Sequence, residues 1–360
     1  MSVKITGSGS YIPTKKILNS DFSNHEFLNE DGTNFRASNE IIAKKFVEIT
    51  GIEERKYANE DQVNSDLGLI AAQKAIKAAN IDPETLDYII FAHNYGDIKF
   101  GTIQSDTVPS LATRVKFLLK IKNPKCVAYD VLFGCPGWVE GVIQANAFIK
   151  AGLAKKCLVI GSETLSRVVD PHDRDSMIYS DGAGATIIEH TLEKGGILSH
   201  ESATHAFEES NYLYFGESFN KNDDTNVRYI KMYGRKIYEF ALTNVPLAMK
   251  SCLDNSGVEI NQIKKILIHQ ANEKMDEAII QRFYKLYDQS VPEGIMPMSI
   301  HKLGNSSVAT VPTLFDLLIK GEIENQSIEK GDYLIFASVG AGMNINFFKN
   351  LIYPKIQTEY

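Results

Sequence analysis

One cysteine of this 360-residue sequence stands where a thiol can become a nucleophile. Residues 127–133 are expected to form a buried strand, and Gly134 permits a tight turn after it. Pro136 suits the first turn of a helix that we expect over residues 136–150. Cys135 would then lie at the positive end of the helix dipole, which predicts a thiol pKa lowered from about 8.5 into the range of about 3.5 to 7.5. We interpret the other three cysteines as small buried hydrophobes: Cys126, Cys157 and Cys252.

A histidine and an asparagine in the second half of the chain are the expected partners of this cysteine. His269 directly follows an apolar run and opens the tetrapeptide H-Q-A-N, and Asn305 lies in the Gly-containing turn H-K-L-G-N-S-S. A cysteine, a histidine and an asparagine at strand ends and turns can form a site for thioester chemistry. Neutral His and Asn side chains can donate hydrogen bonds to a thioester oxygen that becomes an enolate oxygen. This chemistry needs no general base, and no acidic residue adjoins the cysteine loop in the sequence.

The elements that must position these residues occur twice along the chain. An Ala-rich helix, an acidic turn and a short apolar strand follow one another, and the same plan recurs at a constant offset. The expected matches are 71–92 with 247–268, 157–162 with 333–338, and 180–188 with 338–346. A repeated helix-then-strand order occurs in any α/β protein and need not indicate duplication. The recurrence of S-x-G-A-G argues against coincidence. We therefore predict an α/β protein with largely parallel, buried strands, divided into halves at about 1–190 and 191–360.

Composition excludes several classes of protein. With 44% apolar and 23% charged residues, the chain has ordinary globular proportions, which excludes disordered and fibrous classes. A net charge of -7 without a long Lys/Arg run excludes a general nucleic-acid binder. No signal peptide and no stretch of about 18 apolar residues occurs, so we expect a cytoplasmic protein without a membrane partner. The histidines show no paired ligand spacing and the Gly-rich pieces lack a dinucleotide fingerprint, so neither metal nor dinucleotide is expected.

The chain resembles the β-ketoacyl-acyl-carrier-protein synthase III family, which are thiolase-fold condensing enzymes, over nearly its full length. The resemblance implies a thiolase-like, duplicated five-layer αβαβα fold, a homodimer, and no cofactor beyond thioester substrates carried by coenzyme A or by the phosphopantetheine of acyl carrier protein. It rests on ten short pieces in the right order, which are GSGSYIP at Gly7, TGIEER at Thr50, DVLFGCPG at Asp130, LVIGSE at Leu158, DPHDR at Asp170, SDGAGA at Ser180, KMYGRKIY at Lys231, HQAN at His269, HKLGNSS at His301 and SVGAG at Ser338.

The resemblance also implies a role for each candidate residue. Cys135 matches the acyl-accepting cysteine, and His269 and Asn305 match the pair that promotes decarboxylation of a malonyl thioester. The backbone N–H groups of Cys135 and Gly340 match the oxyanion hole of acyl transfer. The predicted reaction is acyl transfer to Cys135 and then decarboxylative Claisen condensation with malonyl-acyl carrier protein. Its product would be a 3-oxoacyl-acyl carrier protein, in fatty-acid or secondary lipid and polyketide biosynthesis.

Two departures from the family pattern bear on the acyl donor. Where the family has a Trp and an Arg that grip the adenine of coenzyme A, this chain has Lys45 and Ile49. We therefore expect a donor bound to carrier protein, or weak binding of coenzyme A. Where the family commonly has a Phe that closes the acyl pocket of the partner subunit, this chain has Val108, which predicts a deeper pocket and starters longer than acetyl.

An acidic carrier protein requires a basic docking surface despite the overall charge. The helix after H-Q-A-N supplies Lys274, Arg282 and Lys285 at spacings that return to one helical face. Arg235 and Lys236 are further candidates, although each of these basic residues except Lys274 could equally be an ordinary solvated charge.

Two other functions remain open on the sequence alone. One is an acyltransferase that does not decarboxylate, or a condensation like that of 3-hydroxy-3-methylglutaryl-CoA synthase. The retention of both His269 and Asn305 favours decarboxylation. The other is a non-catalytic partner subunit of a condensing-enzyme heterodimer, and an intact Cys135 argues against it.

Overall fold

Two β-sheets form the framework of the chain, whose computed structural model describes residues 2–351. The first sheet has the strand order β1 (Ser2–Tyr11), β7 (Asp181–Thr191), β6 (Lys156–Thr164), β4 (Tyr88–His93) and β5 (Val127–Leu132). The second has the order β11 (Ile263–Ile268), β12 (Tyr333–Gly340), β13 (Asn344–Leu351) and β8 (Ile197–Thr204).

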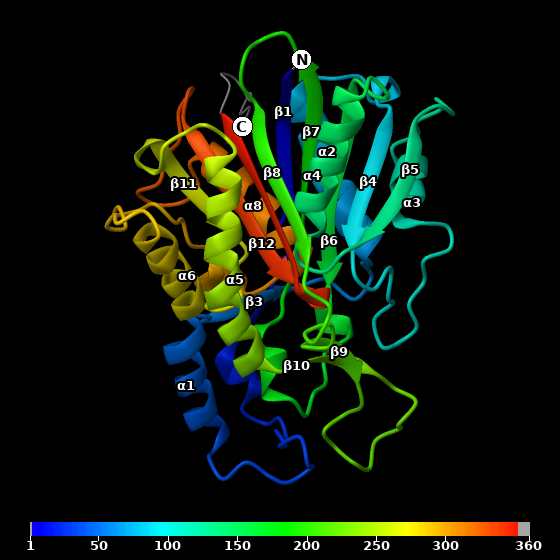
Figure 1. Ribbon diagram of the computed structural model, residues 1–360. Coiled ribbons are helices and arrows are strands. Elements are labelled where there is room, and N and C mark those ends of the chain that lie inside the picture. The colour runs from blue at the N-terminus through cyan, green and yellow to red at the C-terminus, as the bar shows by residue number, and fades with distance from the viewer. Residues whose placement is uncertain (1, 352–360) are drawn as a thin grey trace.

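Helices cover both outer faces of the sheets and fill the space between them (Figure 1). The outer face of the first sheet packs against α2 (Asn64–Ala79) and α3 (Leu111–Leu118), and that of the second against α5 (Gly234–Asp254) and α6 (Glu273–Lys285). Between the sheets lie α4 (Gly137–Lys150) and α8 (Thr310–Lys320), whose apolar residues pack against strands of both. The five-layer αβαβα arrangement predicted for the chain is confirmed.

Residue size and spacing explain two of these contacts. In α8 the buried side chains of Val311, Leu314, Phe315 and Leu318 recur at helical spacing, so the helix presents one apolar face to the inner core. The Ala-rich α2 approaches β1 so closely that a side chain at Gly9 would lie 2.5 Å from a backbone carbonyl oxygen of the helix. Small residues on both sides are therefore required for this layer to form.

The prediction of largely parallel strands is wrong. β4 is parallel to β5 and β6, and β11 is parallel to β12, but β7 is antiparallel to both β6 and β1, and β13 to both β12 and β8. The cause is the connection between strands. A parallel neighbour needs a crossover segment, whereas β12 reaches β13 through the three-residue turn Ala341–Met343 and must return antiparallel.

Strand β5 is also not the buried strand that its apolar sequence predicts. It lies at the edge of the first sheet, where Leu132 is 67% exposed and Val127 is 46% exposed. The second sheet has no named strand at the matching edge within residues 2–351; there the backbone N–H of Ile266 donates to the carbonyl of Ile295 in a loop segment. The first sheet therefore has an open edge flanked by exposed apolar side chains.

The structure supports part of the internal repetition. In both halves a helix precedes a parallel strand, as α2 precedes β4 and α5 precedes β11. The two S-x-G-A-G pieces are not equivalent, because Gly182 and Gly184 lie within β7, whereas Gly340 ends β12 and Gly342 lies in the turn after it. Apolar residues of both halves form one inner core, and the division near residue 190 stays a prediction.

Smaller elements gather at one end of the sheets. They are α1 (Asn39–Thr50), α7 (Ile300–Leu303), the antiparallel pair β2 (Lys15–Leu18) and β3 (Glu54–Tyr57), and the antiparallel pair β9 (Leu213–Gly216) and β10 (Tyr229–Met232). Figure 1 shows α1 and the β9–β10 pair at the lower end of the molecule. These elements enclose the ends of the strands that carry the candidate residues.

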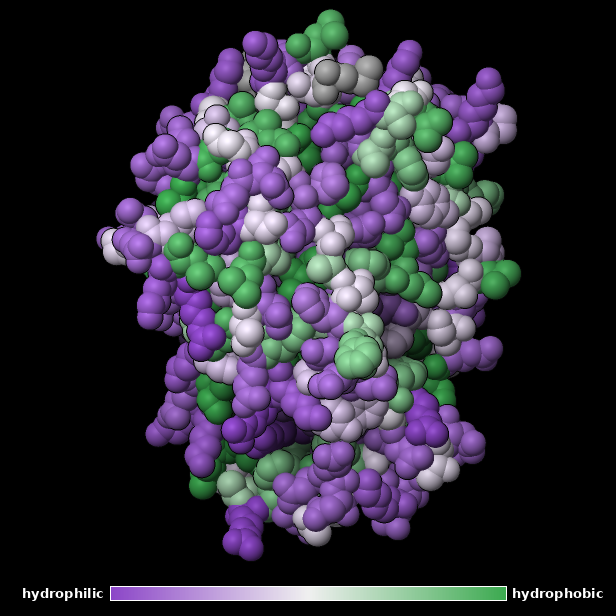
Figure 2. Space-filling view, in the orientation of Figure 1, coloured by the Kyte–Doolittle hydropathy of each residue, from purple (hydrophilic) through white to green (hydrophobic). Residues whose placement is uncertain are grey.

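The surface is dominated by polar side chains. Figure 2 shows hydrophilic residues over most of one face, with hydrophobic residues in small separate patches. Among residues 2–351, no helix is long and apolar enough to cross a membrane.

Candidate active site

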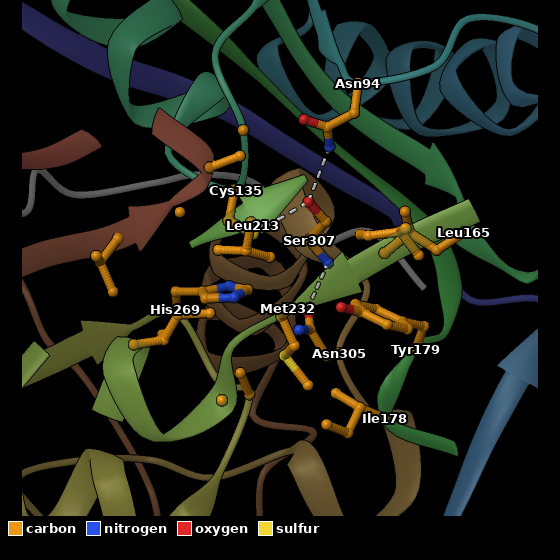
Figure 3. A pocket seen from close by; sticks show the side chains of 18 of the residues that line it. Asn94, Cys135, Leu165, Ile178, Tyr179, Leu213, Met232, His269, Asn305 and Ser307 are labelled. Carbon is orange, nitrogen blue, oxygen red and sulfur yellow. Dashed lines mark hydrogen bonds between the residues drawn. The ribbon is translucent and has the colours of Figure 1, made fainter. Parts of the chain in front are cut away.

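A cavity of about 250 Å³ brings together the candidate residues of both halves (Figure 3). Cys135, His269, Asn305 and Gly340 all line it, although they are separated by up to 205 positions in the chain. Cys135 follows β5, His269 follows β11 directly, and Gly340 ends β12. The cavity therefore forms where the carboxyl ends of these strands meet, as sites in α/β folds commonly do.

The loop of Cys135 and the end of β12 touch backbone to backbone. Gly134 has a φ of +65°, which a side chain rarely adopts, and a Cβ there would lie 2.8 Å from the Ala341 nitrogen. A Cβ at Gly340 would lie 2.6 Å from the backbone nitrogen of Cys135. This close approach brings the Cys135 N–H and the backbone of Gly340 to the same wall of the cavity.

Replacement of Gly340 tests whether this close approach matters. Gly340→Ala forces backbone to shift beside Cys135, so we expect slower acylation of Cys135 and a loss of about 1 to 3 kcal/mol in the free energy of unfolding, as overpacking produces. Gly182→Ala is the matched control, because the new methyl group would lie no nearer than 3.5 Å to its neighbours. Acylation rates by mass spectrometry and thermal unfolding measure both effects. Equal acylation rates in the two variants would show that the close approach of Gly340 to Cys135 does not affect acylation.

The ionisation of Cys135 differs from the expectation based on its place before a helix. The helix α4 begins at Gly137 as predicted, but burial raises the pKa of Cys135 to about 11, and the nearby Glu163 carboxyl also raises it. A hydrogen bond from Ser307 and the backbone N–H of Cys135 itself act in the opposite direction. Removal of the sulfur from water outweighs these contributions, so the resting group is a neutral thiol.

His269 is held in its neutral form. The residue is 4% exposed, its backbone N–H donates to the carbonyl of Ala337 over 2.8 Å, and its Nδ1 has no partner among the described residues. Burial lowers the pKa of His269 to about 4, because a charged imidazole would lose its hydration there. At neutral pH the ring is therefore uncharged and can offer one N–H group as a hydrogen-bond donor.

The turn around Asn305 fixes its side-chain amide. Its backbone N–H donates to Ile178 and its carbonyl accepts from Ser180, at 3.0 and 2.8 Å. Its side-chain Oδ1 accepts the backbone N–H of Ser307 over 2.8 Å, so that the Nδ2 group remains as a donor toward the cavity. Two neutral donors, from His269 and Asn305, thus line the same cavity as the thiol. Such donors can stabilise negative charge that develops on a carbonyl oxygen.

The rest of the cavity is predominantly apolar. Its wall includes Leu165, Ile178, Leu213, Ile230, Met232, Ile237, Met275 and Met343. A cavity that is apolar apart from a few converging polar groups is typical of a small-molecule site.

Comparisons with known proteins agree with this geometry. The family model for 3-oxoacyl-[acyl-carrier-protein (ACP)] synthase III matches residues 129–206, and the model for its C-terminal part matches residues 253–347. The β-ketoacyl-[acyl-carrier-protein] synthase III of Erythrobacter litoralis is 32% identical over 94% of this chain and 95% of its own length. That of Staphylococcus haemolyticus is 32% identical over 95% of this chain and 96% of its own length. This chain belongs to the β-ketoacyl-acyl-carrier-protein synthase III family.

A solved structure supports the same assignment. The crystal structure of 3-oxoacyl-[acyl-carrier-protein] synthase III from Aquifex aeolicus superposes with a TM-score of 0.79 at 28% identity, covering 98% of this chain and all of the other. The thiolase-like fold is thereby confirmed. The activity is that of an acyltransferase of the condensing, 3-oxoacyl-acyl-carrier-protein synthase III type.

Three polar residues of this synthase III site were not predicted from the sequence. The Ser307 hydroxyl contacts the sulfur of Cys135, the Asn94 amide contacts Ser307, and the Glu163 carboxylate accepts from Asn94. A fourth, Tyr179, lines the cavity with a buried hydroxyl that has no partner among the described residues. Ser307 and Glu163 lie in the pieces H-K-L-G-N-S-S and L-V-I-G-S-E, which was the only signal available for them. The expectation that no acid adjoins the cysteine is therefore refined: Glu163 lies near Cys135 but reaches it only through two other side chains.

The predicted carrier-binding residues lie outside the cavity of the synthase III chain. Lys274 is exposed in the first turn of α6, next to the cavity-lining residues Asn272 and Met275, and Arg235 follows the cavity-lining Gly234. Arg282 lies eight residues further along α6, about 12 Å from Lys274, and its guanidinium donates to the carbonyl of Leu242. Lys274 and Arg235 are therefore neighbours in sequence of cavity-lining residues, whereas Arg282 ties α6 to α5.

Val108 does not line the cavity of its own chain. It is 85% exposed in the loop before α3, so any effect of this residue on an acyl pocket requires a second copy of the chain. Among residues 2–351, no group of three or more His, Cys, Asp or Glu side chains could hold a metal ion.

Proposed function

We propose that this synthase transfers an acyl group to Cys135 and condenses it with a malonyl thioester on acyl carrier protein. The observation that carries the proposal is an apolar cavity lined by a cysteine thiol and by two neutral donors, His269 and Asn305. The product would be a 3-oxoacyl-acyl carrier protein. The scheme uses only thioester substrates, and the absence of a further cofactor and a location in the cytoplasm stay predictions.

In the first step the sulfur of Cys135 attacks the carbonyl carbon of the donor thioester. A carbon–sulfur bond to Cys135 forms, the donor's carbon–sulfur bond breaks, and the proton of Cys135 is transferred overall to the departing thiolate. The carbonyl oxygen gains negative charge in the tetrahedral intermediate. The Cys135 and Gly340 N–H groups would stabilise this charge, because their backbones lie together at the cavity wall.

In the second step the malonyl thioester loses carbon dioxide, and its electron pair remains on an enolate. His269 and Asn305 would donate hydrogen bonds to the enolate oxygen. The enolate carbon then attacks the acyl-cysteine carbonyl, the carbon–sulfur bond to Cys135 breaks, and the departing Cys135 thiolate takes up a proton from solvent. A neutral His269 suits this role, because it donates one N–H group without a charge that substrate binding would have to neutralise.

The family assignment does not favour the two alternatives. A condensation without decarboxylation would use an acid–base group at the reacting carbon, and the acid near Cys135 is Glu163, which is fully buried and separated from the sulfur by Asn94 and Ser307. A non-catalytic subunit would have no need of a cysteine that opens on a cavity with two donors.

Intact-mass spectrometry of the purified chain tests the proposed function. Mixing with acyl-CoA or acyl-carrier protein should add the mass of one acyl group, and malonyl-carrier protein should then remove it with formation of 3-oxoacyl-carrier protein. Addition without removal would support the acyltransferase alternative. The absence of any mass addition with every donor would overturn the proposal.

We further propose that the acyl donor is bound to carrier protein rather than to coenzyme A. Lys45 and Ile49, which stand in place of the family's adenine-gripping pair, are both exposed on α1, and neither can enclose a planar base as an aromatic ring does. Acylation should be faster with acyl-carrier protein than with the matching acyl-CoA. Rapid acylation by low micromolar acyl-CoA would contradict this donor preference and leave the condensation itself intact.

Reversal of the charge of Lys274 tests the carrier-docking surface. Lys274→Glu should raise the KM for malonyl-carrier protein about tenfold at low ionic strength, because an acidic partner would then meet a like charge. Added salt should reduce the difference between variant and wild type. Lys330→Glu is the matched control, since Lys330 is exposed and precedes β12 at the opposite end from Gly340, and the strand itself is about 23 Å long. Equal KM values for the two variants would contradict docking beside Lys274.

We propose a homodimer formed through the open edge at β5. Five apolar side chains are exposed around this edge, which is more than a monomeric surface ordinarily leaves beside an unpaired strand: Val108, Phe117, Leu118, Val127 and Leu132. In a dimer, the exposed Val108 of one copy could reach the cavity of the other. Analytical ultracentrifugation of the wild type should show two chains per particle.

Restoring an aromatic ring at Val108 tests its effect on the acyl chain. Val108→Phe should favour shorter acyl donors in the acylation step, because the ring would fill part of the partner's pocket. The ratio of kcat/KM for a short-chain donor to kcat/KM for a medium-chain donor should rise about tenfold. Val127→Phe adds the same bulk at another exposed position of the edge and should leave the preference unchanged. A strong preference of the wild type for acetyl over medium-chain donors would contradict the deeper pocket.

A further inference from the structure

A chain of hydrogen bonds connects a buried carboxylate to the sulfur of Cys135. The Ser307 hydroxyl lies 3.3 Å from the sulfur and donates to it, and the Asn94 Nδ2 lies 3.1 Å from the Ser307 oxygen. The same Nδ2 and the backbone N–H of Asn94 both donate to Oε2 of Glu163, each over 2.7 Å. Figure 3 shows the Asn94 amide pointing at Ser307, and Ser307 pointing at Cys135.

The chemistry of each group fixes the direction of the chain. An ionised carboxylate only accepts hydrogen bonds, so the amide group that faces Glu163 is the NH2 of Asn94 and not its oxygen. The second hydrogen of that NH2 is directed to the oxygen of Ser307, which must therefore accept. The one hydrogen of the Ser307 hydroxyl remains, and the sulfur is its acceptor. The buried carboxylate thus forces Ser307 to act as a donor to Cys135.

The backbone of Ser307 is held in the position that this contact needs. Its φ of +53° lies in the left-handed region, which is uncommon for a residue with a side chain. The side chain of Asn305 compensates, because its Oδ1 accepts the Ser307 N–H over 2.8 Å. Ser307 is 2% exposed and Glu163 is fully buried, so water does not compete for the hydroxyl or the carboxylate.

We propose that Ser307 is a catalytic residue that stabilises the thiolate of Cys135 during acyl transfer, and that Asn94 and Glu163 are positioning residues that orient its hydroxyl. The inference rests on the proposed role of Cys135 as the acyl acceptor. As the thiol loses its proton and attacks the donor carbonyl, the Ser307 hydrogen bond strengthens toward the sulfur, and the proton of Ser307 stays on its oxygen. The proton from Cys135 is transferred overall to the departing thiolate, as in the scheme above.

Several charged or titratable groups face this sulfur and must be separated from the effect of Ser307. Glu163, Tyr95 and Tyr179 interact with Cys135 electrostatically, and His269 lines the same cavity. Behind Glu163 lies His93, whose Nδ1 accepts the Gly96 N–H and whose Nε2 contacts Asp130. Burial raises the pKa of Glu163 to about 7, so its charge is present above neutral pH and opposes ionisation of Cys135. Loss of the Ser307 donor and loss of the Glu163 charge should therefore act in opposite directions.

The rate of Cys135 alkylation by iodoacetamide, followed by mass spectrometry of its peptide between pH 6 and 11, tests the proposal. Ser307→Ala should lower the rate about tenfold at pH 8 and at every pH below the midpoint, because loss of the donor makes the thiolate less stable. Glu163→Gln keeps an acceptor for Asn94 but removes the charge, and should move the midpoint downward. Asn94→Leu leaves Ser307 in place but no longer forces it to donate, and should give a smaller decrease in rate than Ser307→Ala.

Ser306→Ala is the matched control, because Ser306 is also buried, directly beside Ser307, but its hydroxyl contacts Thr310 and not Cys135. Superimposable profiles of Ser307→Ala and wild type, or an equal shift in Ser306→Ala, would overturn the proposal. Asn94→Leu provides the same test if Ser307→Ala does not fold. A separate assay distinguishes failure of the proposed function. If Cys135→Ala still condenses substrates, the proposed function is wrong. The alkylation profiles of wild type and Ser307→Ala still test the Ser307 contact, because they do not depend on condensation.

Discussion

Cys135→Ala is expected to abolish acylation and to lower condensation by at least about 10⁴-fold, since loss of a covalent nucleophile removes the whole two-step route. The effect should be this large because no second thiol can replace it: Cys126, Cys157 and Cys252 are all buried, and none lines the cavity. Intact-mass spectrometry with acyl-carrier protein measures acylation, and release of 3-oxoacyl-carrier protein measures condensation. The alanine variant should show neither.

The three buried cysteines also supply the control. Cys157→Ala changes a thiol within β6 whose pKa burial raises to about 12, and it should leave acylation unchanged apart from any loss of stability. Because a packed methyl-sized change can cost about 1 kcal/mol or more, thermal unfolding of both variants is measured alongside. Persistent single acylation of a folded Cys135→Ala chain would place the acyl acceptor elsewhere and contradict the site.

The sequence was sufficient to find the catalytic candidates because the residues beside each one predict its local structure. Gly134 and Pro136 predict a turn and a helix start around Cys135, and the structure has both. His269 follows an apolar run that does form β11, so its side chain had to lie at a strand end. Cys135 follows a strand of the first sheet and His269 follows a strand of the second, so it was the family resemblance that assigned these distant residues to one cavity.

The ionisation of Cys135 could not be predicted in the same way. The position before α4 is local information, whereas the raised pKa depends on how much protein surrounds the sulfur after both halves have packed. The contact with Ser307 is equally non-local, because it joins a residue after β5 to one 172 positions later. Asn94 directly follows β4, and Glu163 lies in β6. No spacing rule connects side chains from four separate elements.

The position of β5 at the edge of its sheet could not be predicted from the sequence either. The apolar run of β5 is compatible with a central strand and with an edge strand that is covered by another chain, and periodicity does not separate the two. The antiparallel return from β12 to β13 was hidden for a related reason. The glycines of S-V-G-A-G matched those of β7 in sequence, but in the second half Gly340 ends β12 and Gly342 lies in the turn that follows.

His269→Ala and Asn305→Ala are expected to separate the two steps of the reaction. Each removes one donor to the enolate oxygen and should lower decarboxylation and condensation about 10²- to 10³-fold, while acylation of Cys135 persists. The double variant should lose less than the product of the two effects, because both donors act on one oxygen. Release of carbon dioxide from malonyl-carrier protein and acylation by mass spectrometry are measured on the same samples.

Asn305 needs a second variant, because its Oδ1 also holds the backbone of Ser307. Asn305→Ala should therefore slow acylation several-fold, whereas His269→Ala should leave it near the wild-type rate. Asn305→Asp keeps the acceptor for Ser307 but loses the donor, so it should retain acylation better than Asn305→Ala and still fail in decarboxylation. Loss of acylation in His269→Ala would contradict the division of roles.

The pH dependence of decarboxylation follows from the neutral state of His269. With a folded pKa of about 4, His269 remains uncharged down to about pH 5, so decarboxylation by the Cys135→Ala chain should show no loss at pH 6.5 attributable to this ring. An unfolded chain binds the proton near pH 6.5, so the free energy of unfolding should fall as the pH falls from about 6.5 toward about 4. His269→Ala should make that decline shallower. The contrary result would be a decarboxylation rate that falls to half as the pH is lowered to about 6.5, with no such fall in His269→Gln. That result would show that the imidazole becomes charged near pH 6.5.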